Sequence, residues 1–435
     1  ALRNGRSCRA RTCSLSVATC HGSRALSGLM MNKPVERLAI DGGAPVRTTP
    51  FPSWPHYAPD EVEAVAQVLR SGRANYWTGE EGRRFEQEYA TAIGAQHAVA
   101  LMNGTVALES ALHAFGIGPG DEVVVPCRTF IASASCIAQR GATPVVADID
   151  PVSQNITADT IHAVLTPRTR AVITVHLAGW PCDMDPILEL ARQHRLKVIE
   201  DCAQAHGATY KGRFVGTFGH VAAFSFCQDK IISTGGEGGM LVTNDQELWS
   251  KVWSYKDHGK NYGAAVNSAP DLGFNWVHDS FGTNLRMTEM QAAIGRLQLK
   301  KLREWLDIRR RHAAFLNECF AGIPGLRTSV PGAGIGHAYY KYYVFVRPNM
   351  LKSGWTRDRI LQAIVAEGIP CFTGSCPEIY LEKAFAERIK PKDRFRVARE
   401  LGDTSLMFLV HPTLRREHMQ QTCRVVEKVM REASV

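Results

Sequence analysis

Short apolar runs alternate with longer helix-like stretches between residues 98 and 243 of this chain. The runs are rich in Val, Ile and Ala and show little alternation of apolar and polar residues, as in strands buried on both faces. Between them, residues 105–115, 131–140 and 186–195 have the composition of helices. The predicted strands are AVAL (98–101), EVVVP (122–126), TPVVADI (143–149), AVITVHL (171–177), KVIED (197–201), VAAFSF (221–226) and GMLVT (239–243). This order predicts an α/β fold with a mostly parallel seven-stranded sheet between helices.

The pattern changes beyond residue 286. Apolar residues at helical spacing predict one long helix from about Met287 to Phe320. Its charged stretch KKLREWLDIRRRH carries both signs, which favours a solvated helix face over a nucleic-acid patch. Strands are predicted at 339–346 and 405–410, with helices between and after them. We therefore divide the chain into residues 32–285, an N-terminal arm with a large domain, and residues 286–435, the linking helix with a small α/β domain.

Residues 1–31 differ from the rest of the chain. They hold five Arg, three Cys and no Asp or Glu, a composition like that of a mitochondrial presequence. The alternative, which we favour, is a non-native stretch ahead of a start at Met30 or Met31. We expect it to be disordered and leave it out of the fold argument.

Charge and cysteine content narrow the class of protein. The formal net charge is +9, but outside residues 1–31 there are 46 basic and 42 acidic residues, a balance of +4 that suits an anionic small molecule. The nine cysteines from Cys127 to Cys423 show no C-x-x-C pair and no zinc-like spacing. No apolar run reaches the roughly 18 residues that span a membrane. We expect a cytoplasmic protein with reduced thiols, no metal, and neither a membrane nor a nucleic-acid partner.

Two ionisable residues follow neighbouring predicted strands. Asp201 ends KVIED, and Lys230 follows VAAFSF and precedes a Gly-rich turn. A buried acid at a strand end is costly without a partner. The two residues are either a structural ion pair or the two groups that pyridoxal 5′-phosphate (PLP) needs, an amine and a carboxylate for its ring nitrogen.

A third segment fits a phosphate. MNGTVALESAL (102–112) is predicted as a strand end, Asn-Gly-Thr and a helix. Backbone N–H groups at a helix start, beside a Gly and a hydroxyl, bind phosphate well. An ordinary helix N-cap is the alternative.

From about residue 38 onward, the chain resembles the DegT/StrS family of PLP-dependent aminotransferases, which have the fold-type-I architecture and act on nucleotide-linked sugars and aminocyclitols. The motifs that carry the resemblance are LAIDGGAPVR (38–47), YWTG (76–79), FEQEYA (85–90), NGTVAL (103–108), GDEVVVP (120–126), EDCAQAHGA (200–208), FSFCQDK (224–230), GEGGMLVTND (236–245) and NLRMTEMQAAIG (284–295).

The resemblance implies a role for each matching residue. Lys230 resembles the lysine that forms the Schiff base with PLP and, once displaced, moves the proton. Asp201 resembles the partner of the pyridine nitrogen. Gly104 and Thr105 resemble the phosphate ligands.

Other matching residues would complete the cofactor site. Phe130 resembles the residue that stacks on the ring, with a core Phe as the alternative. Gln204 resembles the side chain near the ring's phenolic oxygen, and Ser225 a hydroxyl beside the phosphate. Asn284 resembles the residue that reaches the cofactor of the neighbouring subunit, which would make the enzyme a homodimer with shared active sites.

Four other polar residues are candidates for the site or its surroundings. His176 resembles a residue near the cofactor or substrate, with a hydrogen-bonded strand-end histidine as the alternative. Arg286 is a candidate for gripping a substrate carboxylate or phosphate, with a surface salt bridge as the alternative. We expect His206 to be structural and Glu237 to orient its loop.

The expected activity is transfer of an amino group from glutamate or glutamine to a keto sugar, nucleotide-linked by preference, in polysaccharide or secondary-metabolite biosynthesis. An aminocyclitol aminotransferase of the scyllo-inosose type is the alternative. A PLP-dependent sugar dehydratase is disfavoured, because relatives of that kind lack the lysine that Lys230 matches. A DNA-binding regulator is disfavoured because no basic, helical reading module is evident.

Overall fold

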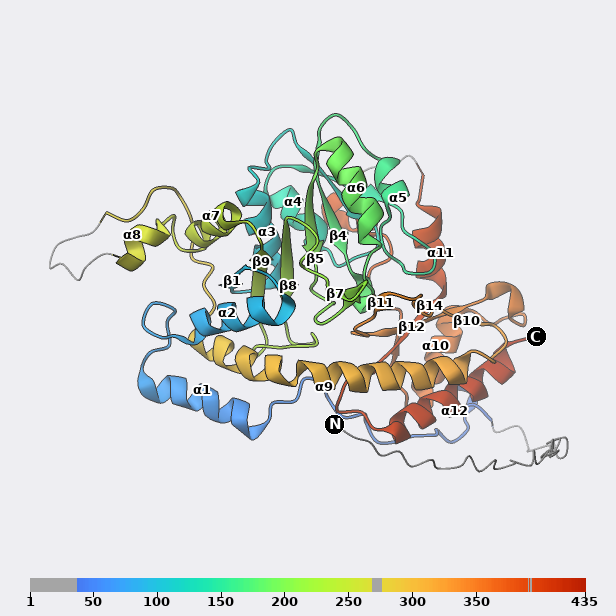
Figure 1. Cartoon of the computed structure of the whole chain (residues 1–435). Helices are drawn as coiled ribbons and strands as arrows, with labels where there is room; N and C mark the ends of the chain where they lie inside the picture. Colours follow the sequence, from blue (N-terminus) through green and yellow to red (C-terminus); the bar gives the residue numbers. More distant parts are fainter. Residues whose placement is uncertain (1–36, 268–275, 390, 392) are drawn as a thin grey trace, which may run out of the picture. The chain divides into compact units, whose positions relative to one another are not determined.

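The computed structural model of the protein describes residues 37–267, 276–389, 391 and 393–435 (Figure 1). The extension predicted at residues 1–31 lies outside this part. Within the described residues, no helix combines the length and apolar character needed to cross a membrane. The division at residues 285 and 286 stays a prediction.

A seven-stranded sheet forms where the seven apolar runs predict strands. The strands are β1 (His97–Leu101), β2 (Glu122–Pro126), β3 (Thr143–Ala147), β4 (Thr169–Val175), β5 (Lys197–Asp201), β8 (Val221–Ser225) and β9 (Gly239–Thr243). Their order across the sheet is β1-β9-β8-β5-β4-β2-β3. Only β9 runs antiparallel to its neighbours, so the prediction of a mostly parallel sheet is confirmed.

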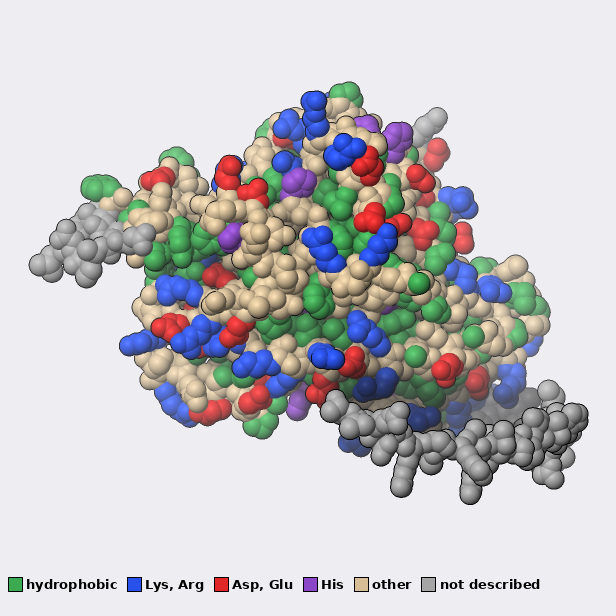
Figure 2. Space-filling model, viewed as in Figure 1, with side chains coloured by type: hydrophobic (Ala, Val, Ile, Leu, Met, Phe, Trp, Pro, Cys, Tyr) green, Lys and Arg blue, Asp and Glu red, His purple; other side chains and the backbone are tan. Residues whose placement is uncertain are grey.

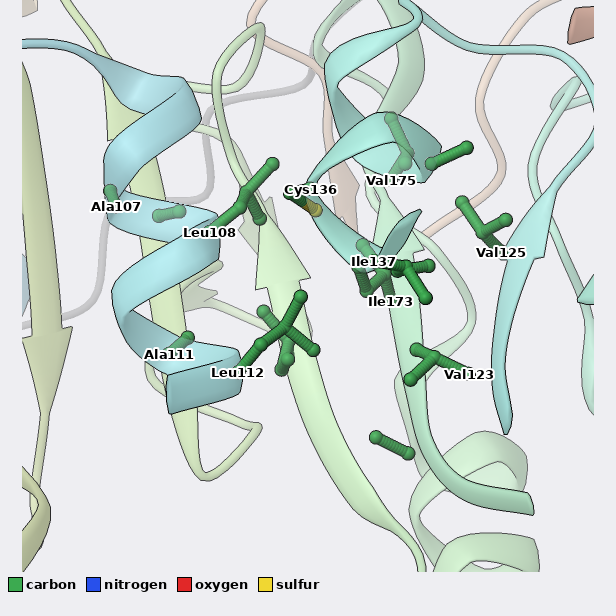
Figure 3. Close-up of a cluster of buried hydrophobic side chains, with 14 of the residues drawn as sticks. Ala107, Leu108, Ala111, Leu112, Val123, Val125, Cys136, Ile137, Ile173 and Val175 are labelled. Atoms are coloured by element: carbon green, nitrogen blue, oxygen red, sulfur yellow. The ribbon is translucent and has the colours of Figure 1, made fainter. Parts of the chain in front are cut away.

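Helices bury both faces of this sheet. On one face, Leu108 and Leu112 of α3 belong to the same apolar cluster as Val123 and Val125 of β2, and Figure 3 shows Ile137 and Ile173 between the two pairs. Val124, between Val123 and Val125, belongs to a separate apolar cluster on the opposite face. The helices that follow the strands are α3 (Gly104–Ala114), α4 (Ala132–Gln139), α5 (Ala158–His162), α6 (Met184–His194), α7 (Gln246–Lys256) and α8 (Tyr262–Asn267). Burial on two sides explains why these strands lack strict alternation.

The long helix α9 (Glu289–Phe320) connects the two sheets (Figure 1). It begins at Thr288, whose hydroxyl accepts the N–H of Gln291 in a capping box. Its first half packs on α1 (Pro59–Ser71) and α2 (Glu81–Ile93), and its second half contacts α12. The elements after α9 are β10 (Leu326–Thr328), β12 (Tyr342–Val346), α10 (Arg357–Ala366), β13 (Cys371–Phe372), α11 (Arg396–Thr404), β14 (Ser405–Phe408) and α12 (Arg416–Ala433).

The second sheet is four-stranded and antiparallel, in the order β10-β12-β14-β13. Its strand β12 begins at Tyr342, three residues later than the apolar run predicts. Tyr339 has a left-handed backbone with a φ of 47°, which turns the chain before the strand begins. Three two-residue strands, β6 (Thr209–Tyr210), β7 (Arg213–Phe214) and β11 (Ile335–Gly336), form a small separate sheet.

The charged side of α9 behaves as the sequence predicts. Lys301 pairs with Asp60 at 3.0 Å, and Arg310 lies 4.0 Å from Asp307. Basic and acidic side chains are intermixed on the face shown in Figure 2. Arg309 is the exception within this stretch, because it points inward and is buried.

Candidate active site

The ends of three strands meet at one edge of the large sheet. Gly239, the first residue of β9, is the register partner of both Leu101 at the end of β1 and Ser225 at the end of β8. Asp201 ends the next strand, β5, which runs parallel to β8. The chain segments that follow these strands therefore project from the same edge, where ligands of α/β sheets bind.

A cavity of about 780 Å³ opens at this edge. Seven of the eight residues predicted to hold the cofactor line it: Gly104, Thr105, Phe130, Asp201, Gln204, Ser225 and Lys230. The side opposite the large sheet comes from the C-terminal part of the chain, including Tyr340, Lys341 and Tyr343. Residues more than two hundred positions apart in the sequence thus share one chamber.

The start of α3 forms one end of the cavity. Asn103 caps this helix, and its side-chain oxygen accepts the N–H of Val106 at 3.0 Å. Gly104 packs so closely on β8 that a Cβ atom there would lie 2.7 Å from the Cβ of Ser225. The first N–H groups of a helix have no partner within it. Thr105 and Ser225, which both carry hydroxyls, line the cavity beside this helix start, where an anion would be stabilised.

Asp201 forms a second wall, and its carboxylate is buried. Oδ2 accepts the Ser133 hydroxyl at 2.8 Å, and Oδ1 accepts the N–H of Ala203 at 3.1 Å. Burial raises the pKa of Asp201, against the opposing effect of these two hydrogen bonds. Among the described residues, no Lys, Arg or His nitrogen forms an ion pair with it. A cationic N–H from a bound ligand would offset the cost of this buried charge.

Two further side chains, Phe130 and Gln204, also line the cavity. Phe130 lies just before α4 and is 65% exposed although it is aromatic, so it is not a core residue. Its ring borders the cavity. Gln204 is nearly buried and is fixed by its side-chain oxygen, which accepts the N–H of Ala178 at 2.7 Å. Its amide group faces the same chamber.

Lys230 reaches the cavity from the loop after β8. Its Nζ lies 3.2 Å from Oδ1 of Asp229 and 3.4 Å from the Tyr340 hydroxyl. Its backbone oxygen accepts the indole N–H of Trp54 at 2.7 Å. Sequence reasoning missed Asp229, Tyr340 and Lys341. For Asp229 the signal was its place next to Lys230, whereas the other two lay in a run interpreted only as a strand.

Asn284 and Arg286 lie outside the lining of this cavity. Asn284 is exposed and pairs through its backbone with Asp257. The Arg286 guanidinium is held by the buried Asp257 carboxylate, with Nη1 2.8 Å from Oδ1. The structure therefore places Arg286 in an ion pair with a buried carboxylate, not in a surface salt bridge, and Arg286 does not line this chain's own cavity.

His176 is also away from the cavity, although it follows β4. Its Nε2 lies 3.1 Å from Glu200, and its Nδ1 accepts the N–H of Cys182 at 2.9 Å. Cys202 lies close to this buried pair, so the three residues resemble a metal site in type. The Glu200 oxygens already accept three backbone N–H groups as well as His176. The arrangement is that of a hydrogen-bonded strand-end histidine with no free ring atom.

His206, expected to be structural, is buried beneath the sheet edge. Its Nε2 bonds to the backbone oxygen of Ser225 at 2.8 Å, and its Nδ1 lies 2.9 Å from the Tyr89 hydroxyl. Burial lowers the pKa of His206 to about 4. This neutral ring fixes the end of β8, five residues before Lys230.

Comparison with known proteins decides the family. Residues 55–429 match the DegT/DnrJ/EryC1/StrS aminotransferase family. The chain belongs to this family. The fold class predicted from the sequence is therefore confirmed, and the protein is a PLP-dependent aminotransferase.

Individual relatives agree with this assignment. An aminotransferase of known structure from Psychrobacter cryohalolentis is 51% identical, with a TM-score of 0.85, over 87% of this chain and 98% of its own. GDP-perosamine synthase of Caulobacter vibrioides is 43% identical over 67% of this chain and 76% of its own. An L-glutamine:2-deoxy-scyllo-inosose aminotransferase of Streptoalloteichus tenebrarius is 37% identical over 78% of this chain and 81% of its own.

The cavity of this family member fits its cofactor on three independent observations. Gly104 and Thr105, the first residues of α3, line the cavity where a helix start can bind a phosphate, and a side chain at Gly104 would collide with Ser225. The buried Asp201 lacks a cationic partner among the described residues, which a protonated ring nitrogen would provide. An exposed aromatic ring, Phe130, borders the space between them.

Proposed function

We propose that this aminotransferase moves an amino group from glutamate or glutamine to the keto group of a sugar carried on a nucleotide. The observation that supports it most is the joint placement of Lys230 and Asp201 in one cavity with an anion-binding helix start. Relatives named as acting on a GDP-linked sugar and on a cyclitol share the family. The aminocyclitol acceptor remains the second candidate, on the name of that relative.

The roles of the residues follow from their positions. We propose that Gly104, Thr105 and Ser225 hold the phosphate of PLP, and that Asp201 accepts a hydrogen bond from the ring nitrogen. Lys230 supplies the amine that anchors the cofactor. When bound, PLP supplies an electron sink for the carbon that gains or loses the nitrogen.

Three further residues would orient and move groups within the site. Phe130 would stack against one face of the ring, and Gln204 would donate its amide N–H toward the phenolic oxygen. Lys230, when its amine is free, would carry the proton at Nζ between the two carbons that exchange it.

We also propose a homodimer in which Asn284 reaches the phosphate in the partner's site. Asn284 lies outside its own cavity and is exposed. Phe281, three residues earlier, is 99% exposed and Trp276 is 90% exposed. Large apolar side chains in contact with solvent are typical of a surface that a partner covers. Arg286 would act from this same surface on substrate only if the dimer brings it there.

A cytoplasmic location agrees with the cysteines. The nine cysteines in the described part of the chain are free thiols, and six of them are buried. Reduced thiols are usual in the cytoplasm. We also propose that the activity belongs to polysaccharide or secondary-metabolite biosynthesis, because the relatives from which we inferred the acceptor act on sugars and cyclitols.

The test is to reduce the purified, PLP-loaded protein with borohydride and to locate the cofactor by peptide mass mapping. We expect it on Lys230, and we expect K230A to lose the visible band. Addition of glutamate should bleach that band in the wild-type protein and yield the pyridoxamine form. The mass of the product from candidate nucleotide-linked keto sugars and from a keto cyclitol then separates the two acceptors. A colourless protein that forms no pyridoxamine phosphate would refute the proposal.

A further inference from the structure

An acid stands directly beside the amine of Lys230. Oδ1 of Asp229 lies 3.2 Å from Lys230 Nζ, and both side chains border the cavity. Only 18% of the Lys230 side chain is exposed, against 49% of Asp229. The carboxylate therefore faces the amine on one side and solvent on the other.

The second oxygen of Asp229 is fixed from the C-terminal part of the chain. The Tyr340 hydroxyl donates to Oδ2, and Lys341 Nζ lies 3.8 Å from the same atom. The Tyr340 hydroxyl also lies 3.4 Å from Lys230 Nζ. Asp229 thus links the lysine loop to the segment that closes the opposite side of the cavity.

The contact between Asp229 and Lys230 bears on the proposed reaction. Lys230 must leave the cofactor when substrate binds and return to it when product departs, in each half of the reaction. A free lysine side chain has several rotatable bonds, so it loses rotamer entropy each time its amine is held in place again. We propose that Asp229 is a positioning residue, whose carboxylate holds the Lys230 amine within the cavity whenever that amine is free. This inference rests on the proposed role of Lys230.

The charges around the amine favour this assignment. Burial works to raise the pKa of Asp229, but Lys230, the Tyr340 hydroxyl and Lys341 outweigh it and hold that pKa below its ordinary value. Asp229 is therefore charged near neutral pH. Burial lowers the pKa of Lys341 to about 8 despite Asp229.

Other ionisable groups face the same space. Arg309, from α9, is buried, and its Nη1 donates to the backbone oxygens of Tyr339 and Tyr340. Asp201 and the exposed Glu237 line the cavity, whereas the neutral His206 is buried against the backbone of Ser225 and is not part of the lining. Asp229 is the acid in contact with the amine, whereas Lys341 and Arg309 are cations on its far side. Loss of the Asp229 carboxylate removes a negative charge beside the amine, whereas loss of Lys341 removes a positive charge. The two substitutions should therefore have opposite effects on a positive charge at the Lys230 nitrogen.

An ion pair with a purely structural role would also hold the loop in place. The test therefore compares two substitutions that should have opposite effects on a positive charge at the Lys230 nitrogen. The variants are D229N and K341M, each loaded with PLP. The readout is the pH midpoint at which the visible band of the lysine-bound cofactor changes. A carboxylate favours a protonated nitrogen beside it. We expect D229N to lower the midpoint by about one pH unit, the low end of the usual range because Asp229 is half exposed. We expect K341M to raise it.

A second readout needs no cofactor. Lys230 in the apoprotein is acetylated at fixed pH, and its modification is followed by mass spectrometry. We expect faster labelling in D229N, because the carboxylate no longer holds the amine in a 3.2 Å contact. Y340F, which removes one partner of Asp229, should change labelling in the same direction by less. It serves in place of D229N if that variant does not fold. Under the assay conditions used for the wild-type protein, D229N should lower kcat about tenfold or more. Its KM should change by less than about threefold.

D185N is the matched control, because Asp185 pairs with Lys211 at 2.5 Å on the surface and neither residue lines the cavity. It should leave the midpoint and Lys230 labelling unchanged. Two results would overturn the inference: D229N indistinguishable from D185N in both readouts, or D229N and K341M moving the midpoint in the same direction. If reduction instead locates the cofactor on another lysine in the wild-type protein, the proposed function fails and not this inference alone.

Discussion

The Ser133 hydroxyl donates a 2.8 Å hydrogen bond to Oδ2 of Asp201, and both side chains are buried. Ser133 is itself held by Thr129, whose hydroxyl lies 2.9 Å away. Thr129 and Ser133 flank Phe130, so one short segment before and within α4 both presents the aromatic ring and orients the acid. Neither hydroxyl was singled out from the sequence.

We expect S133A to weaken cofactor binding. The substitution leaves Oδ2 of Asp201 buried without its donor, which costs about 1–3 kcal/mol. Since this hydrogen bond lowers the pKa of Asp201, its loss should raise that pKa further and disfavour the carboxylate that binds the ring nitrogen. Titration of the apoprotein with PLP measures the loss of cofactor affinity. The thermal unfolding midpoint of the apoprotein measures the loss of stability. Ser135, half-buried on the same helix, provides the control S135A. Equal behaviour of the two variants would contradict the prediction.

We expect G104A to reduce affinity for the phosphate in particular. The added Cβ would lie 2.7 Å from the Cβ of Ser225, so the start of α3 or the end of β8 must move. Overpacking of this kind costs about 1–3 kcal/mol, or roughly tenfold to a hundredfold in affinity. Equilibrium titration should show a larger loss for pyridoxal phosphate than for pyridoxal. G322A is the control, because a Cβ at Gly322 meets no atom within 4 Å. An equal loss for both ligands would show that α3 does not bind the phosphate.

We expect two inactive variants to complement each other in a mixed dimer. K230A lacks the anchoring amine, and N284A lacks the group proposed to reach the partner's phosphate. A dimer with one chain of each has one intact site, formed by Lys230 of the N284A chain and Asn284 of the K230A chain. After unfolding and refolding of an equal mixture, activity should reach about a quarter of the wild-type value, since half the dimers are mixed. Light scattering measures the dimer. A mixture no more active than the sum of its parts would exclude a shared site.

We expect stability to fall below neutral pH because of His206. Its pKa is about 4 in the folded protein, lowered by burial, against about 6.5 when unfolded. Between these values the unfolded chain binds a proton that the folded chain does not, so stability is fully present above about pH 6.5 and decreases toward pH 4. The loss is of the order of 3 kcal/mol.

Urea unfolding at about pH 7.5 and about pH 5 should show about 2 kcal/mol of this loss, because the remainder appears only as the pH falls to 4. H206Q should show a smaller difference between the two pH values than the wild-type protein. H162Q is the control, because His162 is exposed. A wild-type difference retained in H206Q would contradict the assignment to His206.

The sequence by itself determined the sheet and one half of the site. Buried parallel strands are unbroken apolar runs, and their carboxyl ends must meet at one edge. Asp201, Ser225 and Lys230 follow such runs, so their convergence could be predicted from the order of the strands. Gly104 could be predicted from the strand-to-helix turn that it occupies.

Only the tertiary structure decided which residues face Lys230 and its neighbours across the cavity. Tyr340 lies 110 residues from Lys230 in the sequence, and its contact depends on how α9 returns the chain to the sheet edge. The left-handed turn at Tyr339, which sets where Tyr340 and Lys341 point, breaks a run that looks like an ordinary strand. Asp257, which binds Arg286, was equally hidden. Local patterns specify elements, whereas partners distant along the chain depend on packing that no short segment encodes.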